Sequence, residues 1–89
     1  MPQVVRAHGE ISEAVAAGLS DSVNDNGRKN YFFNRLWVGT AGNVVIVLED
    51  DTTLTLHSVI AGRWHIMPPF KRVNGTNTTA VNVRCAVTF

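Results

Sequence analysis

Three histidines, one cysteine and one acidic run are the groups in this sequence with the chemistry for catalysis or metal binding. His8 stands alone, whereas His57 and His65 flank one expected turn, across which they could approach each other. No cysteine or carboxylate completes a site with them at a spacing typical of metal ligands. We therefore expect no metal, and we interpret the histidines as strand residues that face solvent.

The cysteine and the carboxylates have local sequences that argue against catalysis. Cys85 lies in an alternating apolar run, which predicts a buried, inert thiol rather than a nucleophile. Glu49, Asp50 and Asp51 are consecutive at an expected turn, which is typical of a solvated loop. No serine occurs in a Gly-x-Ser-x-Gly motif. The sequence therefore predicts a protein that is not an enzyme and that has no cofactor.

Residues 28–35 (RKNYFFNR) interleave basic and aromatic side chains, as in a platform on which the bases of a single-stranded nucleic acid stack. The chain has 8 Lys and Arg against 7 Asp and Glu, so it lacks the basic excess of a groove that follows a phosphate backbone. We therefore expect no nucleic-acid partner. Instead, we interpret Tyr31, Phe32 and Phe33 as side chains that close the β domain or fill a contact between subunits. Trp64 belongs to the same candidate subunit interface.

A second interpretation stays open, in which the protein is a small β-barrel that binds single-stranded nucleic acid or a glycan. Its stacking platforms would be Tyr31, Phe32, Trp37 and Trp64. Titration of the tryptophan fluorescence with oligonucleotides and glycans distinguishes this interpretation from a purely structural role.

The elements that carry these residues divide into two parts near residue 30. Residues 1–30 are rich in small and polar side chains, and residues 20–27 have the composition of a loop. Ile11, Val15 and Leu19 lie four apart, which predicts a short helix around them. We interpret this first part as an arm that gains order mainly by lying on other subunits.

Residues 31–89 carry only signals of β-structure. The β-branched run 43–49 (NVVIVLE) is typical of a strand covered on both faces, and residues 52–57 alternate as on a half-buried strand. Asp50-Asp51 lies between the two runs as a tight turn. This order predicts a β-hairpin.

Prolines and alternation set the strands expected in the last third of the chain. The short segment 63–67 is expected to stop at Pro68-Pro69, because proline has no N–H to donate to a ladder, and residues 70–73 form a separate short strand. Every odd position from 81 to 89 is apolar, which predicts one full strand. The side chains expected to face the core from this strand are Val83, Cys85 and Val87.

The number and spacing of these strands predict an all-β fold, a small antiparallel β-barrel or sandwich with an extended N-terminal arm. The arm comprises residues 1–30 and the β domain residues 31–89. A domain of this size buries only about 60% of the surface of its unfolded chain, and a single cysteine excludes a disulfide framework within the chain. We therefore expect stabilisation by further copies of the chain in a homo-oligomer.

Residues 34–83 contain, in order, a set of short motifs that resembles one known family. Residues 36–44 (LWVGTAGNV) are similar to its Leu-Tyr-Val-Gly-Thr-x-Gly-Asp-Val segment, and residues 48–54 (LEDDTTL) fit its hairpin. Residues 59–62 (VIAG) resemble its Val-Pro-Ala-Gly turn. Residues 67–80 (MPPFKRVNGTNTTA) are similar to its Leu-Pro-x-x-Val-Lys-Arg-Val-x-x-Thr-Gly-Thr-Thr-Ala stretch. The family is that of the head spike base proteins, small virion proteins of tailed phages and gene transfer agents.

The chain departs from this family's pattern at three places. Ile60 stands where the family has proline, and Trp64-His65 and the doubled Pro68-Pro69 differ in the segment before the Lys-Arg-Val motif. The first 30 residues have no counterpart that aligns. The resemblance therefore says nothing of where the arm attaches.

The resemblance implies a non-enzymatic structural protein on the capsid surface of a tailed phage or phage-like particle. The expected roles are the base of a head spike or a decoration (cement) subunit, with a tail or baseplate position as the third choice. The expected partners are further copies of the chain, as a trimer or a pentamer, and the major capsid protein or other virion proteins.

The first 20 residues contain no apolar run typical of a signal peptide, and the most apolar window, residues 44–48, is too short to span a bilayer. We therefore expect synthesis in the cytoplasm of the bacterial host and no membrane partner.

Overall fold

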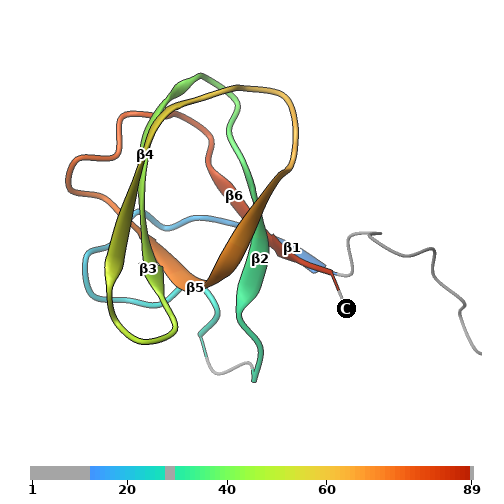
Figure 1. Cartoon of the computed structure of the whole chain (residues 1–89), viewed down its shortest axis with the longest axis vertical. Helices are drawn as coiled ribbons and strands as arrows, with labels where there is room; N and C mark the ends of the chain where they lie inside the picture. Colours follow the sequence, from blue (N-terminus) through green and yellow to red (C-terminus); the bar gives the residue numbers. More distant parts are fainter. Residues whose placement is uncertain (1–12, 28–29, 89) are drawn as a thin grey trace, which may run out of the picture.

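A computed structural model describes residues 13–27 and 30–88 and shows an all-β fold, which confirms the predicted fold class. The described residues form one antiparallel sheet in the order β1-β6-β2-β5-β3-β4, which coils around a single core (Figure 1). The strands are β1 (Glu13–Ala16), β2 (Phe33–Trp37), β3 (Gly42–Leu48), β4 (Thr53–Val59), β5 (His65–Asn74) and β6 (Arg84–Val87). β1 and β4 are the two edge strands of this sheet.

The predicted β-hairpin is confirmed as β3 and β4. The Leu48 N–H donates to the Thr52 carbonyl (2.8 Å), and the connecting residues include Asp51 at φ 69°, as in three-residue hairpin loops. The Asp50 carboxylate accepts hydrogen bonds from the Thr52 N–H (3.2 Å) and hydroxyl (2.6 Å), which fix the turn. Residues 44–47 are all buried, as expected for a strand covered on both faces, and β3 lies between β5 and β4 in the sheet.

The expectation that Pro68-Pro69 ends a strand is wrong, because β5 continues through both prolines. The first half of β5 pairs with β2 and the second half with β3, and Phe70 pairs with both. Each ladder has a register shift at this change of partner. The two prolines lie within this irregular region, where the ladder does not require their missing N–H groups.

The last strand is shorter than the alternation predicts. β6 comprises only residues 84–87, whereas Val81 forms an isolated bridge with Thr40 and Asn82 has φ 55°. This left-handed residue breaks the alternation, so Val81 is 51% exposed although Val83 is 4% exposed. The inward direction of Val83, Cys85 and Val87 is confirmed, since all three are buried.

The helix expected around residues 11–19 is wrong for the part that the structure describes. Val15 lies in β1 and pairs with Cys85 of β6, while Leu19 follows the strand, and Ile11 lies outside the described residues. A helix of two or three turns is marginal on its own. Pairing with β6 instead satisfies the backbone groups of both strands.

The described part of the arm packs on the sheet of its own chain. The Asp25 carboxylate accepts the N–H groups of Gly18 (2.8 Å) and Val73 (2.9 Å). The Asp25 N–H donates to the Lys71 carbonyl (2.8 Å). Residues 18–27 are therefore fixed to β5 through the backbone and the carboxylate of Asp25. The expectation that the arm of residues 1–30 also binds other subunits stays a prediction, and residues 1–12 and 28–29 of this arm lie outside the described residues.

Two of the glycine-containing motifs meet at the start of β3. The Asn43 N–H donates to the Thr79 hydroxyl (2.9 Å), and the Asn43 carbonyl accepts the N–H groups of Thr79 and Ala80 (2.8 and 3.2 Å). A Cβ atom on Gly42 would lie 2.6 Å from the Ala80 nitrogen. Only glycine permits this close approach of the two backbones.

Candidate assembly surface

The four aromatic residues predicted at a subunit interface do not form one surface. Phe33 is fully buried in its own core, with its ring centroid 5.5 Å from that of Phe70, so it is not available to another subunit. Tyr31 packs edge-on against Phe33 (5.9 Å) and is half-buried, and burial raises its pKa. Phe32 is 38% exposed and Trp64 is half-buried. The interface interpretation therefore does not hold for Phe33.

Of the two edge strands among the described residues, β4 is the longer, and one of its sides has no neighbouring strand. In the antiparallel ladder with β3, the bond from the Leu48 N–H to the Thr52 carbonyl places the even-numbered residues of β4 in the hydrogen-bonded positions. Thr53 and Thr55 therefore direct their backbone N–H and C=O groups away from β3. No Lys, Arg, Asp or Glu occurs in β4. Charged side chains are one of the means by which proteins prevent edge strands from pairing, and β4 lacks them.

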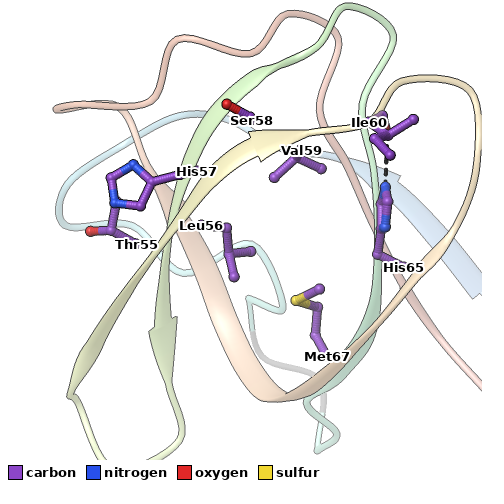
Figure 2. A pocket seen from close by; sticks show the side chains of 8 residues that line it. All are labelled: Thr55, Leu56, His57, Ser58, Val59, Ile60, His65 and Met67. Carbon is purple, nitrogen blue, oxygen red and sulfur yellow. Dashed lines mark hydrogen bonds between the residues drawn. The ribbon is translucent and has the colours of Figure 1, made fainter.

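An open groove of about 370 Å³ lies beside this edge, between β4 and the first half of β5. Leu56, Val59 and Met67 point into it and form an apolar floor (Figure 2). His65 Nε2 lies 2.8 Å from the Ile60 carbonyl and ties the start of β5 to the end of β4. The Ile60 side chain is 61% exposed. The groove and the edge together offer both backbone hydrogen bonds and apolar pockets, which is what a docked extended segment requires.

The histidines do not form a common site. In Figure 2 the His57 ring points away from the groove, while His65 lies across it with its hydrogen bond to Ile60. His8 lies outside the described residues. Within the part of the chain that the structure describes, no three His, Cys, Asp or Glu side chains lie close enough together to hold a metal ion.

The thiol and the carboxylates take the positions expected of structural groups. Cys85 is fully buried, and desolvation raises the pKa of its thiol. Asp51 in the hairpin turn forms an ion pair with Lys71 of β5. Hydrogen bonds from Thr52 lower the pKa of Asp50, which is therefore charged at neutral pH. The exposed Glu49, Asp50 and Asp51 form an acidic tip on the β3–β4 hairpin.

The sequence names Trp37 as a candidate stacking platform but does not predict that Arg84 lies over it on the outer face of the sheet. Trp37 of β2 and Arg84 of β6 are cross-strand partners, and the Arg84 guanidinium carbon lies 5.9 Å from the Trp37 ring centroid. The signal is present in the alternation of both strands, since Trp37 adjoins the inward Leu36 and Arg84 adjoins the inward Cys85. Finding it needed the register between β2 and β6, which are far apart in the chain.

The described residues include no helix that is long and apolar enough to cross a membrane. Comparison with protein families, with curated protein sequences and with solved structures finds no match to this chain.

Proposed function

We propose that the protein is a non-enzymatic structural subunit of a tailed-phage or phage-like particle, on the capsid surface, as a head spike base or a decoration subunit. It acts as a homo-oligomer with rotational symmetry, a trimer or a pentamer, and contacts the major capsid protein or other virion proteins. The role consists of presenting the same surface many times, so that many weak contacts give strong attachment.

The observation that carries this proposal is the uncharged free edge of β4 with the apolar groove beside it. A small domain that exposes such an edge is suited to pairing with another chain. The proposal that this other chain belongs to a phage-like particle rests on the resemblance of residues 34–83 to the head spike base family. Its motifs 36–44 and 67–80 meet in space through Gly42, Asn43 and Ala80, so the two motifs form one local structure.

Native mass spectrometry of the purified protein, together with mass spectrometry of purified particles, tests the proposal. We expect a trimer or a pentamer at micromolar concentration and many copies of the protein in each particle. A chain that stays monomeric in solution and is missing from the particles would contradict the proposal. Detection of saturable glycan or oligonucleotide binding by tryptophan fluorescence would favour the alternative binding role.

A further inference from the structure

The outer face of the sheet across β2 and β6 carries a cationic strip. Leu36 and Cys85 are cross-strand partners that face the core, so the residues beside them point to the opposite face. On that face, Arg35 lies opposite Ala86, and Trp37 lies opposite Arg84. We name Arg35, Trp37 and Arg84 the arginine strip.

Arg84 of the arginine strip is exposed, and Arg35 and Trp37 are half-buried. Among the described residues, neither of its arginines forms an ion pair; Arg35 donates to the Asn34 carbonyl (3.0 Å) and Arg84 lies over the Trp37 ring. The exposed Ala14 and Ala16 of β1 flank the strip, so the described residues on that side present only small side chains. A guanidinium held over an aromatic ring keeps its planar N–H edge available to a carboxylate.

Apolar surface lies beside these charges. Ile66 of β5 is the cross-strand neighbour of Arg35 and is 77% exposed. Tryptophan and arginine are among the residue types that dominate the energetics of protein interfaces, and the exposed Ile66 adds apolar area beside them. This composition favours a protein partner with an acidic surface over a polymer bound by charge alone.

The chain itself carries such an acidic surface. On the acidic tip, the Asp51 charge is balanced by Lys71, whereas Glu49 and Asp50 form no ion pair with any described residue. The tip projects at the end of the β3–β4 hairpin, at the opposite end of the sheet from β1, β6 and β2 (Figure 1). The tip and the strip thus lie on different parts of the sheet, and a contact between them can join two copies.

We propose that the acidic tip of one copy docks on the arginine strip of the next copy, with Glu49 and Asp50 facing Arg35 and Arg84. The contact joins two different surfaces, so it is heterologous and generates a ring when the rotation between copies closes. It rests on the proposed function, in which the protein forms a symmetric homo-oligomer, and it names the surfaces that meet.

Charge reversal and charge exchange test this contact in the full-length protein. Glu49→Arg is preferred to a change of Asp50, because Asp50 accepts the hydrogen bonds that fix the hairpin turn. We expect E49R and R84E each to raise the concentration at half-assembly by about ten-fold, since each places like charges together. The double variant E49R/R84E restores opposite charges and should recover most of the loss. Assembly is read by native mass spectrometry and sedimentation, with circular dichroism to verify folding.

Arg63→Glu is the matched control, because it makes the same change of charge at an exposed position in the turn before β5, outside the strip. It should leave assembly within about two-fold of the unmodified protein, as is usual for a surface change away from a contact. Raising the salt concentration from about 0.1 M to about 1 M shortens the screening length from about 10 Å to about 3 Å and should weaken assembly of the unmodified protein.

Several results would overturn the contact. Unchanged assembly in both single variants, no recovery in the double variant, or an equal loss in R63E would each do so. Binding of an oligonucleotide to the strip in competition with assembly would assign Arg84 to a nucleic acid instead. Composition of the particles is measured separately, so a protein that is on particles but assembles without this contact disproves the contact and leaves the proposed function intact. Conversely, recovery of assembly in E49R/R84E together with absence of the protein from particles would support the contact and contradict the proposed function.

Discussion

At the scale of single residues, the two valines on either side of Asn82 differ in burial. Val83 is 4% exposed and Val81 is 51% exposed, although both belong to the same apolar alternation. The positive φ of Asn82 lies between them and changes the direction in which the following residues point. The same substitution can therefore be made at a buried valine, Val83, and at an exposed one, Val81.

We predict that Val83→Asp lowers the free energy of unfolding by about 3–5 kcal/mol, because it buries a charge without a partner. Val81→Asp is the matched control and should change this free energy by about 0.5 kcal/mol or less. Urea denaturation monitored by tryptophan fluorescence measures both values. Equal losses in the two variants would show that Val81 faces the core as well.

A second prediction at this scale concerns the Cys85 thiol. Because burial raises the pKa of this thiol, we expect no reaction with a thiol reagent in the native protein and rapid reaction after denaturation. The thiol of the unfolded chain ionises around its ordinary value of 9.0, whereas the folded protein keeps it protonated. The stability contributed by this group is therefore complete below that pH and falls as the pH rises above it.

Comparison with Cys85→Ala isolates this pH dependence. The variant should be less stable at neutral pH, because it loses a buried side chain, but its stability should decrease less steeply at alkaline pH. Labelling of the native protein as fast as of the unfolded chain would contradict the burial of Cys85.

At the scale of elements, the close contact between the start of β3 and the segment before β6 fixes two distant parts of the chain. Gly42 lies against the backbone of Ala80, and Asn43 exchanges hydrogen bonds with Thr79. The Asn43 side chain also accepts the N–H of Ser58 (3.1 Å), whose φ is 54°. One residue thus joins β3, the end of β4 and the loop after β5.

We predict that Gly42→Ala lowers the free energy of unfolding by about 1–3 kcal/mol, because the new methyl group must push two backbones apart. Gly18→Ala is the matched control. Its Cβ would meet only Asp25 Oδ1, at 3.5 Å, and its φ is not positive, so stability should stay within about 0.5 kcal/mol. Thermal denaturation followed by circular dichroism measures both. A neutral Gly42→Ala variant would contradict the tight contact.

At the scale of the whole molecule, an open sheet has two edges, and the two are unequal. β1 has four residues and β4 has seven. β4 also lies beside the apolar groove and carries no charged Lys, Arg, Asp or Glu side chain. Of the two edges, β4 is therefore the one that we expect to take part in assembly.

We predict that Thr55→Lys weakens assembly by about ten-fold while the single subunit stays folded, because a charged side chain on an edge strand opposes pairing with another strand. Thr40→Lys makes the same substitution at an exposed position outside β4 and should have no effect. Sedimentation velocity at several protein concentrations measures the change. Equal assembly of both variants would exclude the β4 edge as an interface.

The local sequence by itself was sufficient for the β3–β4 hairpin and for the inward direction of Val83, Cys85 and Val87. A continuous β-branched run, a two-residue period and a turn of aspartates are each encoded in neighbouring residues, so no distant contact is needed to predict them. The burial of Cys85 followed from the same alternation.

Only the tertiary structure decided the rest, because each remaining feature depends on partners far away in the chain. Val15 has a helical spacing but lies in a strand, since β6 offers it an unpaired edge. β5 passes through Pro68-Pro69 because its partner changes there from β2 to β3. The stack of Trp37 and Arg84 exists through the register of two strands that the sequence separates by 46 residues between Val38 and Val83, a span that no local pattern covers.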